Sequence, residues 1–353
     1  MNKIINKALF YKEWINVRWV TLLTIFILLY YKVYGVILVL NQNKICLQQN
    51  GKVWTDRWFN NGLYVRTTYS NVMIFAVVML AIILFIGEKT SETQGFIASM
   101  PFTRKDIILN KWIIGVLSLL ISFVVTYIIL SLFYFANING LDTTLNPYSD
   151  IVKWFFMDTF QYICIFTFMM LVQTVMGNSI VSGVVGAIIL IVPYLITLAS
   201  LRIIIKYHIM NLGYFAFNKI GDWLHKWLNI YIYNSPGQIW INTEENSNKD
   251  MYRTFYYTNY KLKLLVLFIL TCLFLYLSYV SYKKRNLEYN LRLIVFKNLK
   301  PVFICGVSIC SGLLAGLTLE SERLGLFAIW ASLFTIIGYF ISKLLLKFLS
   351  STK

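Results

Sequence analysis

A short polar segment between two long apolar runs contains the residues whose types and spacing point most clearly to a function. Glu88 and Glu92 lie four positions apart, so a helix would place both carboxylates on one face. The apolar residues after them would form the tip of that helix, and a proline would end it because proline has no amide proton. We assign a protein-contact role here to Glu88, Glu92, Gln94, Phe96, Ile97, Met100, Pro101, Arg104 and Lys105.

The residues after the proline predict the start of a new helix. Thr103 is followed three positions later by Asp106, which is capping-box spacing, although the usual partner there is Glu or Gln. Arg104 and Lys105 then lie at the membrane surface. A rigid amphipathic element that joins two spans in this way is suited to act as a mechanical lever.

Motifs for an internal energy source or for catalysis are missing from the sequence. There is no GxxxxGK[ST] phosphate loop, no HExxH and no GxSxG. The spans delimited below contain no Asp or Glu, whereas ion-driven transporters usually keep a carboxylate in the membrane. If the protein transports something, its energy therefore enters from outside the membrane.

Two residues inside the spans are candidates for a translocation path. Lys32 is the only charge near the middle of a span, where it either lines a polar pathway or faces acidic lipid or substrate; snorkelling or pairing with a polar neighbour is the alternative. Pro193 leaves a carbonyl unpaired and bends its helix, which suits a moving or cavity-lining helix, though packing explains it as well.

Composition makes the bilayer the solvent of this chain. Of its 353 residues 58% are hydrophobic and 13% are charged, more apolar surface than a soluble protein of this length could bury. We assign the net charge of +17 to membrane flanks attracted to anionic headgroups, and not to nucleic-acid binding. The five cysteines and two histidines form no disulfide framework and no metal-ligand spacing, so we expect no metal site.

The hydropathy pattern predicts an all-α polytopic membrane protein with six to eight spans. A basic amphipathic elbow helix, 4–19, precedes them, with a charged extension of the first span as the alternative. The runs that qualify or nearly qualify as spans are Val20–Leu40, Ser70–Gly87, Trp112–Ala136, Thr159–Met176, Ile180–Leu201, Leu262–Tyr282, Val302–Leu319 and Leu324–Leu346.

The distribution of charge places the N-terminus in the cytosol. With that choice ten of the fifteen acidic residues fall outside, and most basic residues of the outer segments lie in one long loop, where the positive-inside rule fades. A composition rich in Asn, Lys and Ile suggests the plasma membrane of a bacterium. The resulting regions are an elbow helix at 1–19, spans 1–5 at 20–201 with a coupling helix at 88–100, an extracytoplasmic loop at 202–261, and spans 6–8 at 262–353 with a basic cytosolic loop at 283–300.

Two further patterns have open interpretations. The long outer loop is unusually aromatic, and it either contacts substrate or caps the outer ends of the spans. Ser308, Gly312 and Gly316 recur every four residues, so a neighbouring helix can approach that face closely. This stripe indicates either packing within the chain or a dimer seam.

The first 140 or so residues resemble the membrane subunit of a type-2 ABC exporter. In that family an elbow helix precedes the first span, and an acidic segment after the second span leads through a glycine and an apolar patch to a proline-arginine turn. The matching residues here are Phe10, Tyr11, Lys12, Glu13 and Trp14, then Glu88, Glu92, Gly95, Phe96, Ser99, Pro101, Arg104 and Lys105.

The resemblance implies that Glu88–Met100 is a coupling helix seated in a groove of a separate ATP-binding subunit. That partner would hold ATP and Mg²⁺, so no cofactor is expected in this chain and the chain is not itself an enzyme. A second permease copy or homologue would complete the path. The family core usually has six spans, fewer than the eight counted here, and the large loop after the fifth span is an addition to it.

The cargo is not specified by any motif. The aromatic outer loop and the apolar spans favour an amphipathic or hydrophobic cargo, such as a peptide or a lipophilic drug. The alternatives are an immunity or sensor protein that works without an ATPase, and a membrane-embedded enzyme acting on lipid-linked substrates. The acid–base candidates for such an enzyme are Asp150, Asp158 and His208.

Overall fold

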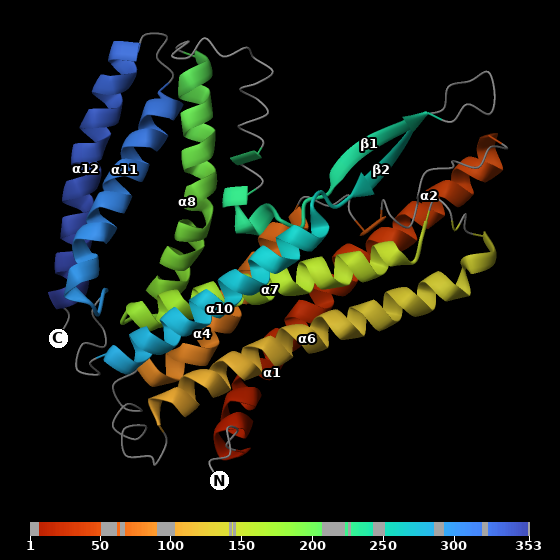
Figure 1. Ribbon diagram of the computed structural model, residues 1–353, viewed down its shortest axis with the longest axis horizontal. Helices are drawn as coiled ribbons and strands as arrows, with labels where there is room; N and C mark the ends of the chain where they lie inside the picture. The colour runs from red at the N-terminus through yellow and green to blue at the C-terminus, as the bar shows by residue number, and fades with distance from the viewer. Residues whose placement is uncertain are drawn as a thin grey trace. The chain divides into compact units, whose positions relative to one another are not determined.

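The computed structural model describes residues 7–50, 62–63, 68–89, 103–140, 143, 146–206, 223–224, 227–242, 251–285, 293–319 and 324–351. It confirms the predicted all-α polytopic membrane protein (Figure 1). The helices are α1 (Lys7–Leu28), η1 (Leu29–Val33), α2 (Tyr34–Asn50), α4 (Thr68–Lys89), α6 (Arg104–Ala136), η2 (Ile138–Gly140), α7 (Ser149–Val175), α8 (Ser179–Lys206), η3 (Ile230–Ile232), α10 (Tyr260–Lys284), η5 (Lys297–Leu299), α11 (Lys300–Thr318) and α12 (Leu324–Ser351).

Seven helices of the described part of the chain are long and apolar enough to cross a membrane. They correspond to seven of the eight predicted spans. The eighth, predicted as Val302–Leu319, is α11, whose apolar part Lys300–Gly316 is shorter than the others. At 1.5 Å per residue this part is roughly 25 Å long, less than the ~30 Å hydrocarbon core of a bilayer.

The N-terminal helix differs from the predicted elbow. We expected the elbow helix to end at Trp19, but α1 continues through this residue without a break. This continuity agrees with the alternative, in which the N-terminal residues extend the first span. The reason is a buried face that is shared by both halves, because Val17 and Val20 on either side of the boundary are both buried. The helix then passes through the π-helical turn η1, which contains Lys32, into α2.

One element was not predicted. Strands β1 (Gly237–Asn242) and β2 (Met251–Tyr256) form an antiparallel hairpin within the expected extracytoplasmic loop, with Gly237 opposite Tyr256. The sequence analysis identified only a polar, aromatic loop there. Short strands that pair with each other are specified by their cross-strand contacts more than by their own hydropathy.

The chain divides into two compact units. The first contains 1–80, 109–167 and 232–274, and the second contains 81–108, 168–231 and 275–353. In the first unit, α1 is joined to α6 by hydrogen bonds of Thr21 with Ser118 (2.7 Å) and of Thr24 with Ser122 (2.6 Å). The core between α6 and α7 is aromatic, because Phe123 stacks on Tyr162 with their ring centroids 5.9 Å apart.

In the second unit, α11 packs against α12 and also contacts α8 (Figure 1). The packing uses the small-residue stripe of α11. A Cβ on Gly312 would lie 2.7 Å from the carbonyl oxygen of Ala331 on α12, and one on Gly316 would lie 2.6 Å from the ring of Phe327. The interpretation of the stripe as packing within the chain is therefore confirmed, and the dimer seam at Gly312 and Gly316 is wrong because α12 already occupies that face.

Candidate functional site

Three of the nine residues assigned to the partner contact lie in the described part of the chain, at the two ends that flank the segment. Glu88 is at the end of α4, and Arg104 and Lys105 begin α6. The contact helix itself is outside the described residues. Its six assigned residues are Glu92, Gln94, Phe96, Ile97, Met100 and Pro101.

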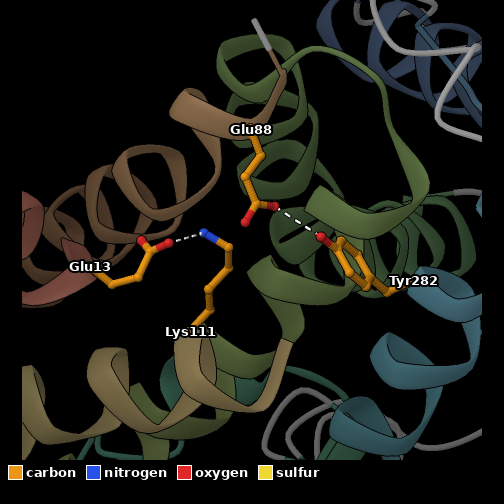
Figure 2. Close-up of polar contacts among 4 residues, drawn as sticks. All are labelled: Glu13, Glu88, Lys111 and Tyr282. Carbon is orange, nitrogen blue, oxygen red and sulfur yellow. Dashed lines mark hydrogen bonds and ion pairs between the residues drawn. The ribbon is translucent and has the colours of Figure 1, made fainter. Parts of the chain in front are cut away.

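The end of α4 is attached to the end of α10. The hydroxyl of Tyr282 donates a hydrogen bond to a carboxylate oxygen of Glu88 at 3.0 Å, and Figure 2 shows the phenol directed at that carboxylate. Glu88 is half-buried and Tyr282 is buried. An ionised carboxylate that accepts from a phenol forms a strong hydrogen bond, so this contact ties the last turn of α4 to α10.

The neighbouring residue, Lys89, is buried and attaches α4 to the end of α7 and the start of α8. Its ammonium donates to the side-chain oxygen of Gln173 at 2.6 Å and to the hydroxyl of Ser182 at 3.4 Å. Ser182 also donates to Gln173 at 2.6 Å, and the Gln173 amide donates to the carbonyl of Ser179 at 2.9 Å. The network orients Gln173 so that its oxygen faces the lysine charge.

The start of α6 is attached to the same end of α10. One guanidinium nitrogen of Arg104, Nη1, donates to the carbonyl oxygens of Lys283 at 2.9 Å and of Arg285 at 2.8 Å. The predicted cap of this helix is confirmed: the amide of Asp106 donates to the Thr103 hydroxyl at 3.2 Å, and the Thr103 amide donates to the Asp106 carboxylate at 3.2 Å. This capping box holds Arg104 in the first turn of α6.

Arg285, directly after the end of α10, is a further charged group at this site. Its side chain is 3% exposed, and burial lowers the pKa of its guanidinium, while the nearby Tyr282 and Glu88 act in the opposite direction. A guanidinium titrates far above neutral pH, so Arg285 stays charged. Lys105, by contrast, is exposed and takes part in no hydrogen bond or ion pair with the described residues.

The segment Leu293–Val295 is attached to the turn between α7 and α8. After the basic loop, the chain at Leu293–Val295 pairs with the α7–α8 turn, where the amide of Val295 donates to Val175 at 3.1 Å and that of Gly177 donates to Leu293 at 3.4 Å. Leu293 and Ile294 pack with Val172 and Met176 in a small apolar cluster. The ends of α4, α6, α7 and α10 in the second unit are thus linked by named contacts.

Comparison with protein families decides what kind of protein has this arrangement. The family model described as ABC-2 family transporter protein matches residues 8–287, more than half of the chain. The chain belongs to the ABC-2 transporter family. Comparison with curated proteins and with solved structures gives no match.

Membership shows that the chain is the transmembrane subunit of an ABC exporter. An ABC-2 permease is a multi-pass membrane protein and a transport component, not an enzyme by itself, and the family implies a partner subunit that binds ATP. The match ends before α11 and α12, which form the C-terminal helix pair of this permease.

The permease has a second buried polar site, around Lys32 in the first unit. The Lys32 side chain is 6% exposed, and its ammonium donates to the carbonyl of Leu63 at 2.6 Å. It lies 4.1 Å from the ring centroid of Tyr69 and 5.6 Å from that of Trp154, within the range of cation–π attraction. The alternative given for Lys32, pairing with polar neighbours, describes these contacts; its place in a translocation path stays a prediction.

Asp158 is a buried carboxylate that the sequence analysis did not place inside a span. We expected spans without carboxylates, but Asp158 lies inside α7, one residue before the predicted start at Thr159, and is fully buried. It accepts hydrogen bonds from the Tyr69 hydroxyl at 2.8 Å and from the Trp154 indole at 2.9 Å. The polar residues Asp150, Lys153 and Asp158 interrupt the hydropathy there, so the sequence pattern places the start of the span too late.

The remaining candidates are placed as follows. Glu13, within the helical range of the first span, pairs with Lys111, and Asp150 pairs with Lys153 at 3.4 Å. Pro193 is half-buried inside α8, where it stays a predicted path residue. His208 is outside the described residues, and among those that are described no group of three or more His, Cys, Asp and Glu could hold a metal ion.

Proposed function

We propose that this permease exports amphipathic or hydrophobic peptides, or lipophilic drugs, across the plasma membrane of a bacterium, with its N-terminus in the cytosol. The ATP-binding partner holds ATP and Mg²⁺ and seats the 88–100 segment in a groove on its surface. Two permease copies, or this chain and a homologue, enclose the path. The apolar spans and the aromatic 202–261 loop support this cargo class.

One observation supports the coupling route. Both ends of the 90–102 segment are tied to the end of α10, by Glu88 with Tyr282 and by Arg104 with the carbonyls of Lys283 and Arg285. A force applied to the segment therefore acts on three helices together. Small displacements at such an attachment are passed on as rigid-body shifts of helices, since packed helices do not deform continuously.

The cytosolic placement of these contacts is consistent with their charges. Basic residues cluster at the ends of α4, α6 and α10; they are Lys89, Arg104, Lys105, Lys283, Lys284 and Arg285. Basic residues near span ends favour the cytosolic side. This end of the unit then meets the ATP-binding subunit.

The test combines co-purification with transport. The permease is isolated from its own cells in mild detergent, and the associated proteins are identified by mass spectrometry. We expect a stoichiometric subunit with an ATP-binding cassette, and its absence would support the immunity or sensor alternative.

The complex is then placed in vesicles and supplied with ATP, and uptake of a fluorescent amphipathic peptide and of a lipophilic dye is measured. Glu92→Lys and Phe96→Asp should keep membrane insertion and abolish ATP-driven uptake, because each places an unsuitable charge in the partner's groove. Lys12→Gln, which changes an exposed charge on α1 outside the nine assigned contact residues, serves as the comparison. Uptake that both contact variants leave at the wild-type level would refute the coupling route.

A further inference from the structure

A groove lies along α1 where this helix packs beside α6 in the first unit. Its volume is about 490 Å³, within the range of roughly 300–1,000 Å³ typical of small-molecule sites. Trp14, Arg18, Leu22 and Ile25 line it from α1, and Ile121 lines it from α6. Arg18 and Thr21 are its polar members, and the surface that the lining exposes to the groove is almost wholly apolar.

The groove follows from how the two helices are joined. The face of α1 that meets α6 bears Glu13, Thr21 and Thr24, whose side chains bond to Lys111, Ser118 and Ser122. Trp14, Arg18, Leu22 and Ile25 recur every three or four residues on the adjoining face.

Arg18 is the one charged residue among those that line the groove. Arg18 is exposed, and its guanidinium stacks on Trp19 with 5.5 Å from Cζ to the ring centroid. Among the described residues no carboxylate pairs with it. Ile25 lies seven residues further along α1, or roughly 10 Å at the rise of a helix. Tryptophans such as Trp14 and Trp19 favour the level of lipid headgroups.

We propose that the groove binds one anionic phospholipid, with the headgroup phosphate at Arg18 and an acyl chain along Leu22, Ile25 and Ile121. A phosphate suits a planar guanidinium, which can donate two parallel hydrogen bonds to it. An acyl chain suits a narrow apolar groove on a helix that also exposes apolar side chains, such as Phe26.

A second copy of the chain fits this face less well. Residues 1–19 contain four basic residues and one acidic residue, Glu13, which is buried against Lys111. Two such faces in contact would bring positive charge onto positive charge, whereas an anionic lipid neutralises it. The proposal does not depend on cargo or on the ATP-binding partner.

Native mass spectrometry of the whole permease in detergent tests whether the groove binds an anionic phospholipid. Phosphatidylglycerol and phosphatidylcholine are added in turn. Arg18→Gln should weaken phosphatidylglycerol binding about fivefold, the equivalent of the ~1 kcal/mol that one basic residue contributes at an anionic surface. It should weaken phosphatidylcholine binding less, because the choline cation of that lipid offsets the charge of its phosphate. Lys12→Gln is the matched control, because Lys12 is exposed on the same helix and does not line the groove. Equal losses in both variants would mean diffuse attraction and overturn the proposal.

A second pair of variants tests the groove itself. Ile121→Trp should fill it and weaken binding of both lipids, whereas Val124→Trp, one turn away on α6 and equally exposed (40% against 39%), should not. Retained binding in Ile121→Trp would overturn the proposal. A wild-type dimer that Ile121→Trp converts to monomers would do the same, because it would identify a second copy as the occupant. Thermal melting in detergent establishes that each variant is folded.

Discussion

The ammonium of Lys111 on α6 lies 2.8 Å from a carboxylate oxygen of Glu13 on α1, and the two side chains are only 1% and 2% exposed (Figure 2). Two charges are stable in such surroundings only as a pair, because an unpaired buried charge loses its hydration without compensation. The pair joins the first helix of the permease to α6. It therefore links the N-terminal region to the helix that begins at Arg104.

Removing one member of this pair should destabilise the permease strongly. Lys111→Met leaves the Glu13 carboxylate buried and should lower the free energy of unfolding by about 3–5 kcal/mol. The double variant Glu13→Leu with Lys111→Met should recover most of that loss. Unfolding in mixed micelles, followed by tryptophan fluorescence, measures both. Lys12→Met removes an exposed lysine and is the control; if it costs as much as Lys111→Met, the pair has no special role.

The attachment of Arg104 to α10 should be needed for coupling. Arg104→Gln removes donors to two carbonyl oxygens at a partly exposed site, a loss of roughly 1 kcal/mol, so cargo transported per ATP hydrolysed should fall about fivefold. Lys283→Gln keeps its carbonyl and should behave as wild type. Uptake and ATP hydrolysis measured in the same vesicles give the ratio, and an unchanged ratio in Arg104→Gln would contradict the coupling route.

The close packing of α11 on α12 should be sensitive to a single methyl group. Gly312→Ala places a Cβ 2.7 Å from the Ala331 carbonyl oxygen and against Thr335, and should cost about 1–3 kcal/mol. Gly306→Ala on the same helix meets nothing within 4 Å and should be neutral or stabilising by up to ~1 kcal/mol. Hydrogen exchange of α11 and α12 should be faster in the first variant alone.

The Lys32 site offers a test of its predicted place in the translocation path. Asp158→Leu removes the acceptor for the buried Tyr69 hydroxyl and Trp154 indole, so it should destabilise the permease by about 1–3 kcal/mol for each donor left unpaired. The double variant Lys32→Met with Asp158→Asn should recover stability. If transport in vesicles recovers with it, both charges have a structural role; if a stable double variant transports no cargo, Lys32 belongs to the path.

Patterns that depend on neighbours along the chain were predicted from the sequence. Hydropathy located the spans because a helix in lipid must be apolar over most of its length. The Thr103–Asp106 capping box followed from spacing, since its partners are three residues apart. The acidic, apolar and proline-arginine order of 88–105 indicated the family that the match over residues 8–287 then established.

The tertiary structure decided which distant groups meet. Tyr282 and Glu88 are 194 residues apart, and Lys111 and Glu13 are 98 apart, and no local pattern pairs them. Asp158 fell outside the predicted span because a polar stretch of sequence is read as a membrane boundary. In the fold its carboxylate accepts hydrogen bonds from Tyr69 and Trp154 and is attracted by the charge of Lys32, so it can lie inside a buried helix. The sequence by itself determines that this chain is an ABC-2 permease; only the packing of its helices decides which charges are buried, with which partners, and what they hold together.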